Sequence, residues 1–118
     1  MLRYCIEKAQ EGIKQGRVRV FCVATDKHGR VLAESSNRYD LTHPVQAKYA
    51  KKAGQEHRIY LHAEIAVLCS LARQRIDIEK VVLYIARVGA KGNPLPACPC
   101  PVCSLALQEA GIRKIVTT

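Results

Sequence analysis

The chain has 118 residues, with 19 lysines and arginines against 10 aspartates and glutamates, which gives a formal net charge of +9. This length predicts a single domain over residues 1–118. Hydrophobic residues make up 48% and charged residues 25% of the chain, and these proportions exclude a disordered or collagen-like protein. No apolar run approaches the roughly 20 residues of a membrane-spanning helix, and the first residues lack the apolar region of a secretory signal. We therefore expect a cytoplasmic protein with no membrane partner.

The first third of the chain predicts a helix followed by a β-hairpin. Apolar residues recur at helical spacing over residues 2–15, and Gly16 can end this helix. Residues 18–25 are β-branched or apolar at most positions, which is typical of a strand covered on both faces. A turn at residues 26–29 joins this strand to a second one over residues 31–34, so the two are expected to form a hairpin.

A long irregular stretch separates the hairpin from the second half of the chain. It spans residues 35–60, and within it residues 45–53 are compatible with a short helix. The patterns that follow alternate in type, as helix 62–74, strand 81–86, loop 88–96, helix 101–110 and strand 112–117. Helices that alternate with strands buried on both faces indicate an α/β fold. We expect a three-layer α/β/α sandwich around a minimal four-stranded mixed sheet.

Six cysteines stand at positions 5, 22, 69, 98, 100 and 103. An even number is compatible with a set of disulfides, but such frameworks belong to small secreted domains. Cys5, Cys22 and Cys69 lie inside apolar segments, and we expect them to pack as small core residues. The other three crowd into residues 98–103, which marks this segment as chemically informative.

Two short motifs, each at the start of a predicted helix, carry side chains of the metal-ligand type. One is His62-Ala63-Glu64, and the other is the CxxC of Cys100 and Cys103. The positive end of a helix favours thiolates, and two thiolates with one imidazole make a zinc site whose fourth position stays open. An open position is typical of catalytic zinc, which lowers the pKa of a water molecule toward neutrality. Glu64 is then placed to handle the proton of that water.

These motifs resemble the signature of the zinc-dependent cytidine and deoxycytidylate deaminase superfamily, which reads H-x-E followed by P-C-x-x-C. The order of the predicted elements is similar too, so the resemblance covers nearly the whole chain, and it is strongest to the short deoxycytidylate-deaminase-like proteins of bacteriophages. It implies a sandwich of the cytidine-deaminase type and hydrolytic deamination of cytosine. The roles that the resemblance implies are Zn²⁺ ligation by His62, Cys100 and Cys103, a proton shuttle at Glu64, sugar binding by Asn37 and pyrimidine binding at the Ala63 backbone.

Other uses of the motifs stay open at this point. A structural zinc site would take Cys98 as a fourth ligand and so close the open position. A thioredoxin-like redox site would use the CxxC alone and would have no need of His62. A non-catalytic zinc module would bind nucleic acid through its basic surface. We expect Cys98 to lie near the metal as a bystander.

Basic residues gather in the loop that leads to His62. Residues 38–60 hold five lysines and arginines against two acidic residues, and Lys51 and Lys52 are the candidate partners of a nucleotide phosphate. The most specific expectation is therefore deamination of a free nucleotide, dCMP to dUMP. The alternatives are a nucleoside or a single-stranded nucleic acid as substrate.

Two further properties bear on partners. Three tyrosines could stack on a base or cover the core, namely Tyr39, Tyr49 and Tyr60. The net charge of +9 predicts weak, salt-sensitive binding of nucleic acid. A small sheet with exposed helices is expected to hide one face against a second copy of the chain, so we expect a homo-oligomer.

Overall fold

The computed structural model describes residues 1–15, 19–38 and 40–118. Its helices are α1 (Leu2–Glu11), α2 (Pro44–Lys52), α3 (Ala63–Ala72) and α4 (Pro101–Ala110), with 3-10 turns at Gly12–Gln15 and Ile78–Lys80. Its strands are β1 (Arg19–Thr25), β2 (Val31–Ser36), β3 (Val82–Val88), β4 (Pro94–Leu95) and β5 (Lys114–Thr117). The expectations for Gly16 as a helix terminator, Val18 as the first strand residue and Tyr39 as a stacking partner lie outside the described residues.

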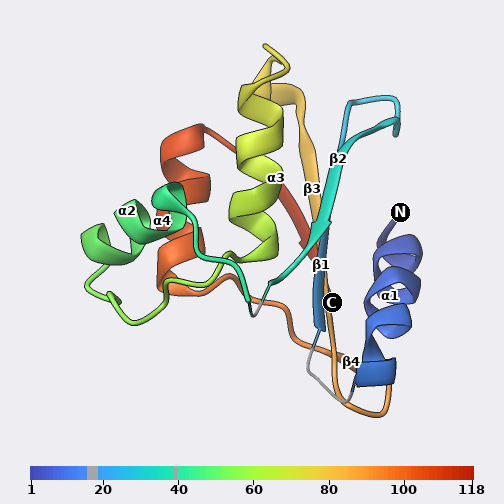
Figure 1. Ribbon diagram of the computed structural model, residues 1–118. Helices are drawn as coiled ribbons and strands as arrows, with labels where there is room; N and C mark the ends of the chain where they lie inside the picture. Colours follow the sequence, from blue (N-terminus) through green and yellow to red (C-terminus); the bar gives the residue numbers. More distant parts are fainter. Residues whose placement is uncertain (16–18, 39) are drawn as a thin grey trace.

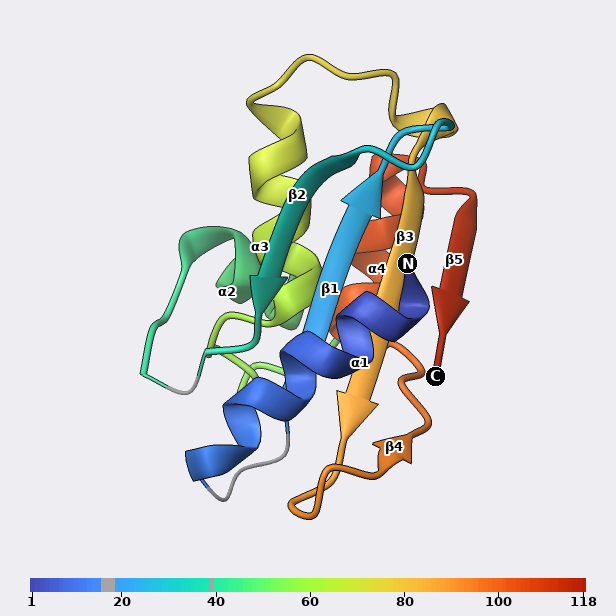
Figure 2. The ribbon, with the colours of Figure 1, turned by 90° about the vertical axis from the view of Figure 1, so that its right-hand side faces the viewer.

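The sheet is mixed, and β3 pairs with three of its strands. β1 lies between β2 and β3 and is antiparallel to both. β5 runs parallel to the first part of β3, with Lys114 opposite Val82, while β4 is antiparallel to the last two residues of β3. Figure 1 shows α1 on one side of the sheet and α2, α3 and α4 on the other, and Figure 2 shows α1 crossing in front of β1 and β3. The predicted three-layer α/β/α sandwich is confirmed.

In the part of the chain that the structure describes, the sheet has one strand more than the four expected. β4 consists of Pro94 and Leu95 and lies inside the stretch 88–96 that the sequence predicts as a loop. Two residues are too few to show an alternating pattern, and a proline has no N–H to donate, which confines it to an edge strand. β3 also continues to Val88, beyond the predicted end at residue 86, so Arg87 belongs to a strand.

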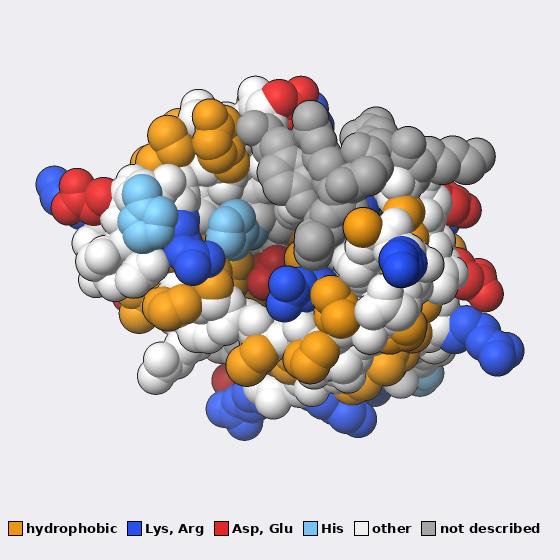
Figure 3. Space-filling model, turned by 90° about the horizontal axis from the view of Figure 1, so that it is seen from below, with side chains coloured by type: hydrophobic (Ala, Val, Ile, Leu, Met, Phe, Trp, Pro, Cys, Tyr) orange, Lys and Arg blue, Asp and Glu red, His pale blue; other side chains and the backbone are white. Residues whose placement is uncertain are grey.

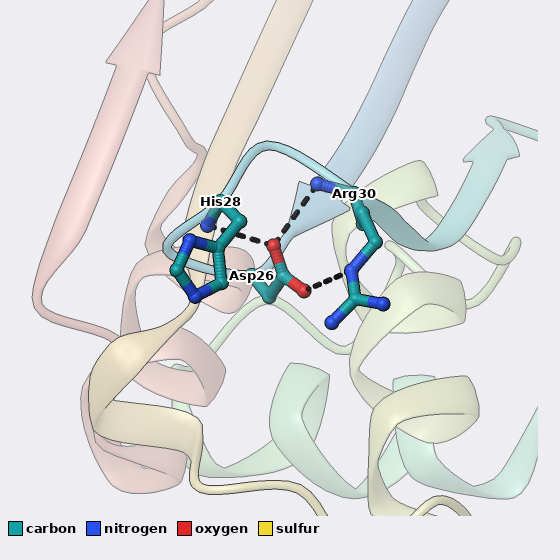
Figure 4. Close-up of polar contacts among 3 residues, drawn as sticks. All are labelled: Asp26, His28 and Arg30. Atoms are coloured by element: carbon teal, nitrogen blue, oxygen red, sulfur yellow. Dashed lines mark hydrogen bonds and ion pairs between the residues drawn. The ribbon is translucent and has the colours of Figure 1, made fainter.

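A charged turn connects β1 to β2 (Figure 4). Oδ1 of Asp26 accepts hydrogen bonds from the backbone N–H groups of His28, at 2.8 Å, and Arg30, at 3.0 Å. Its Oδ2 accepts a third from Nε of Arg30 at 3.0 Å. These bonds, with the backbone N–H of Arg30 first among them, lower the pKa of Asp26. Gly29 adopts a φ of +82°, a backbone conformation that glycine accepts without steric cost. The predicted hairpin is confirmed.

β1 separates two parts of the core. Cys22 packs in the cluster that the sheet shares with α3, and Val23 packs on the opposite face against Cys5 of α1. Both cysteines are fully buried, as expected. Cys69 is instead half-buried, at the margin of a second cluster formed by α2, α3 and α4. Among the described residues, no helix is long and apolar enough to cross a membrane.

The cluster between α2, α3 and α4 brings two helix starts together. His62 is the N-cap of α3 and Cys100 is the N-cap of α4, which has Pro101 at its first position. Proline suits that position because its N–H would have no partner inside the helix and its φ is preset. At the other end, Gly111 at φ +86° ends α4 in the left-handed conformation typical of a helix C-terminus. The fold thus places both sequence motifs at one end of the molecule.

Candidate metal centre and pocket

His62, Cys100 and Cys103 form a compact group of ligand-type atoms. Nδ1 of His62 lies 3.2 Å from Sγ of Cys103 and 3.5 Å from Sγ of Cys100. All of the ligand atoms of the three residues lie within 4.8 Å of one another. Because two sulfurs and one imidazole nitrogen are the donors that zinc prefers, and because they converge from two helix starts, this group fits a Zn²⁺ ion.

Hydrogen bonds within the group shift the pKa values of its side chains. Hydrogen bonding from Cys103, helped by His62, lowers the pKa of Cys100 to about 3. The same bond to Cys100, together with burial, raises the pKa of Cys103, and hydrogen bonding with Cys100 raises that of His62. The lowered pKa of Cys100 favours the thiolate, the form in which cysteine binds a metal.

Glu64 lies one residue into α3 from the buried Ala63, and its side chain is 6% exposed. Burial raises the pKa of this carboxyl, because the charged form loses water. A buried carboxylate needs partners, and His62, Cys100 and Cys103 are the side chains that act on Glu64. It thus sits beside the metal group without belonging to it.

A pocket of about 200 Å³ opens in front of this group. It is lined by Val20, Asn37, Arg58, His62, Glu64, Arg87, Cys98 and Cys100. Figure 3 views the molecule from below and shows histidine and basic side chains around a recess in which an acidic side chain is visible. The pocket therefore joins ligand-type, acidic and cationic groups in a space suited to a small molecule.

Asn37 reaches the pocket from just beyond the end of β2, as the sequence argument requires. Its backbone N–H donates to the carbonyl of Val20 at 3.1 Å, and its Oδ1 accepts from the N–H of Val20 at 3.1 Å. The first bond holds the backbone of Asn37 against β1, and the second holds its side chain there. Among the described residues, its Nδ2 group has no hydrogen-bond partner, so a donor remains for a ligand.

Lys51 and Lys52 are not among the residues that line the pocket. Both are exposed on the last turn of α2, where Nζ of Lys52 lies 3.3 Å from Oε1 of Glu109 on α4. The cations that do line it are Arg58, from the same basic loop, and Arg87, from β3. Sequence reasoning missed Arg87, although a lone charge in an otherwise apolar strand is a signal that could have found it.

Cys98 is exposed and lines the pocket, but it does not belong to the group formed by His62, Cys100 and Cys103 in the described part of the chain. The arrangement predicted for a closed structural site, with Cys98 as the fourth ligand, is therefore not formed here. Three protein ligands and an adjoining pocket are instead the arrangement of a catalytic zinc site.

An α/β/α sandwich with a His-Cys-Cys group at two helix starts defines a zinc-binding domain with an accessible metal. The chain belongs to the cytidine and deoxycytidylate deaminases: the family described as "Cytidine and deoxycytidylate deaminase zinc-binding region" matches residues 1–118. Members of this family are zinc-dependent hydrolytic deaminases, so the resemblance noted in the motifs is confirmed. A search of curated proteins finds no matching sequence.

Proposed function

We propose that this protein deaminates cytosine in a free nucleotide and converts dCMP to dUMP. The observation that carries the proposal is the composition of one pocket, in which Glu64 and the metal group share about 200 Å³ with two arginines. The reaction replaces the 4-amino group with oxygen from water. The C4–N bond breaks, a C4–O bond forms, and ammonia leaves.

His62, Cys100 and Cys103 are the proposed ligands. Zn²⁺ held by them supplies a water molecule with a pKa near neutrality and so provides a nucleophile. The buried Cys103 anchors the group, because its side chain is fully enclosed between α3 and α4. The pocket-lining His62 and Cys100 leave the open side toward the substrate.

Glu64 is the proposed proton shuttle. Its carboxylate is buried and lines the pocket, so it can accept a proton from water and deliver it to the base without competition from bulk solvent. Protonation of N3 makes C4 more electrophilic, and a second transfer to the amino group makes ammonia the leaving group. Both transfers need only one carboxylate.

Two residues are proposed to orient the nucleoside. Nδ2 of Asn37 is available as a donor to a sugar hydroxyl, since Oδ1 is occupied by the Val20 backbone. The Ala63 backbone is the proposed partner of the pyrimidine, because Ala63 stands between two pocket-lining residues, His62 and Glu64. Ala63 itself is fully buried and does not line the pocket.

Arg58 and Arg87 are the proposed phosphate ligands, in place of Lys51 and Lys52, which the sequence suggested. Both arginines line the pocket, whereas Lys51 and Lys52 do not. Arginine presents several N–H donors in a planar fork that matches phosphate oxygens. Two arginines are enough for a single phosphate, which favours a mononucleotide over a nucleoside.

The test is a comparison of substrates on zinc-loaded protein. Purified enzyme is incubated with dCMP, deoxycytidine and a cytosine-bearing single-stranded oligonucleotide, and uracil products are quantified by chromatography. We expect dCMP to be deaminated faster than deoxycytidine or the oligonucleotide. Absence of uracil product from every substrate contradicts deaminase activity, and equal turnover of dCMP and deoxycytidine contradicts the nucleotide preference.

An exposed apolar cluster favours single-stranded nucleic acid as a second candidate substrate. Leu41, Ile59 and Tyr60 are 40%, 39% and 50% exposed. They lie together, because the N–H of Leu61 donates to the carbonyl of Leu41 at 2.8 Å, and they adjoin Arg58. An exposed aromatic side chain in a basic segment offers a surface on which an unpaired base can stack. The oligonucleotide arm of the same assay decides between the two substrates.

We also propose that the chain forms a homo-oligomer. An apolar groove of about 210 Å³ runs between α2, α3 and α4, and its lining includes Val45, Tyr49, Leu68 and Ala106. A second copy would remove this surface from water. Light scattering at several concentrations tests this, and a monomer mass throughout contradicts it.

A further inference from the structure

Gln46 is a fully buried amide in an otherwise apolar helix interface. It lies in α2 and is 0% exposed, in the company of Ala50, which is equally buried. Its Nε2 donates to the backbone carbonyl of Arg58 at 2.8 Å, and its Oε1 accepts from the backbone N–H of His62 at 3.1 Å. The nitrogen and the oxygen of one side-chain amide thus bind the backbone at the first and the last residue of the segment 58–62.

The two bonds explain why a polar residue stands at this position. An apolar side chain of similar length would fill the same space, but it would leave the N–H of His62 and the carbonyl of Arg58, both partly buried, without these partners. The two backbone groups belong to pocket-lining residues with different proposed roles. His62 is a proposed metal ligand, and Arg58 is a proposed phosphate ligand. Gln46 itself is not among the pocket-lining residues.

We infer that Gln46 is a positioning residue that sets the spacing between the metal centre and the anion-binding end of the pocket. This inference rests on the proposed function for the identity of the anion. Because one rigid amide fixes both backbones, loosening it lets His62 and Arg58 move independently. Metal affinity and the preference for a phosphorylated substrate are then lost together, although the Gln46 side chain contacts neither the metal nor the phosphate.

Gln55 provides a matched comparison within the same loop. Its Oε1 accepts from Nε of Arg58 at 3.1 Å, and its carbonyl accepts from the N–H of Arg58 at 2.9 Å. It therefore supports the Arg58 side of the segment directly, and it makes no hydrogen bond to His62 among the described residues. Removal of its side-chain amide should affect the anion end of the pocket alone.

Three variants and one control test the inference. Gln46→Met keeps the length of the side chain and removes both hydrogen bonds, whereas Gln46→Glu keeps an acceptor for the N–H of His62. Gln55→Met removes only the bond to the Arg58 side chain. Gln108→Met makes the same chemical change at an exposed glutamine on α4 and serves as the control. Zn²⁺ affinity is measured by competition with a chromophoric chelator, with no substrate present, and the ratio of kcat/KM for dCMP and deoxycytidine is measured separately.

Gln46→Met should weaken Zn²⁺ binding by about tenfold or more, as is typical when a group that supports a metal ligand is removed. It should also reduce the dCMP preference by about tenfold, which is the effect of about 1.4 kcal/mol. Gln46→Glu should restore Zn²⁺ affinity to within about threefold of the unaltered protein, because the acceptor is retained. Gln55→Met should lower only the dCMP preference, and Gln108→Met should change neither quantity.

Unchanged Zn²⁺ affinity in folded Gln46→Met overturns the inference, as does a Gln46→Glu variant that binds zinc no better than Gln46→Met. If Gln46→Met does not fold, nuclear magnetic resonance of the unaltered protein decides. The side-chain amide signals of Gln46 should shift on addition of Zn²⁺ and again on addition of dCMP, and those of Gln108 should not; no shift with Zn²⁺ overturns the inference. The chelator assay needs no substrate, so it still gives a result if dCMP is not deaminated.

Discussion

Nδ1 of His62 lies 3.2 Å from Sγ of Cys103, although 41 positions separate the two residues in the chain. The contact exists because α3 and α4 pack side by side and begin at the same end of the sandwich. Each helix contributes a ligand from its first turn or its N-cap, where the helix dipole favours a thiolate. The pairing of two helix starts is what turns two short motifs into one metal group.

Removing a sulfur should remove the metal. Cys103→Ser replaces a soft, buried sulfur with a hydroxyl that binds zinc poorly, so we expect the zinc retained against a chelator to fall at least about tenfold. Cys98→Ser is the matched control, because Cys98 lines the pocket without belonging to the group. Elemental analysis after dialysis measures both variants. Equal loss of zinc from the two would show that Cys98 is a ligand and that the site is closed.

The sequence was sufficient for the metal group because its parts are local. Each motif occupies a few consecutive residues, and helix starts can be recognised from their spacing and prolines. Asn37, which the resemblance singled out, directly follows the end of β2 and lines the pocket, and its role in sugar binding stays a prediction. The short-range sequence pattern alone determines the position of each of these residues at the end of a helix or strand.

Where Arg87, Gln46, Lys51 and Lys52 stand relative to the pocket depended on tertiary packing instead. Arg87 enters it because β3 continues past its predicted end and pairs with β4, a strand of two residues. Gln46 stands in a helix of mixed polarity, and it is buried only because α2 packs over the segment 58–62. Lys51 and Lys52 shared the charge and the loop of Arg58, but the helix turns them toward solvent. Tertiary packing decided all of these positions.

Glu64→Gln should abolish turnover while the metal stays bound. The amide preserves the size of the side chain but cannot transfer a proton, so kcat should fall by about 10²–10⁴-fold. Zinc content should match that of the unaltered protein, because Glu64 lies beside the metal group without belonging to it. Steady-state kinetics with dCMP and metal analysis of the same sample measure the two effects. Activity within about threefold of the unaltered enzyme would remove Glu64 from the mechanism.

Arg58→Ala and Arg87→Ala should each separate nucleotide from nucleoside. A hydrogen bond to a charged group is worth about 1.5–3 kcal/mol, so kcat/KM for dCMP should fall at least about tenfold in either variant. Turnover of deoxycytidine should change little, since it has no phosphate. Lys51→Ala provides the comparison, because Lys51 carries the same charge on the last turn of α2 but does not line the pocket. A larger loss of dCMP preference in Lys51→Ala than in the arginine variants would return the phosphate site to α2.

The turn between β1 and β2 should make stability depend on pH through Asp26. Hydrogen bonds from the Arg30 and His28 backbone and the ion pair with Arg30 lower the folded-state pKa of Asp26 below its unfolded value of about 4. Its stabilising contribution is therefore fully present above that unfolded value and is lost as the pH falls through the lower folded pKa.

Asp26→Ala should lower the Tm at pH 7, and the difference from the unaltered protein should shrink below pH 4. Asp26→Asn keeps the Oδ1 acceptor for both backbone N–H groups and removes only the charge, so it should lower the Tm at pH 7 by less. Thermal unfolding followed by circular dichroism at a series of pH values measures these shifts, and a difference that stays constant from pH 7 to pH 2.5 would show that the carboxylate charge does not support the turn.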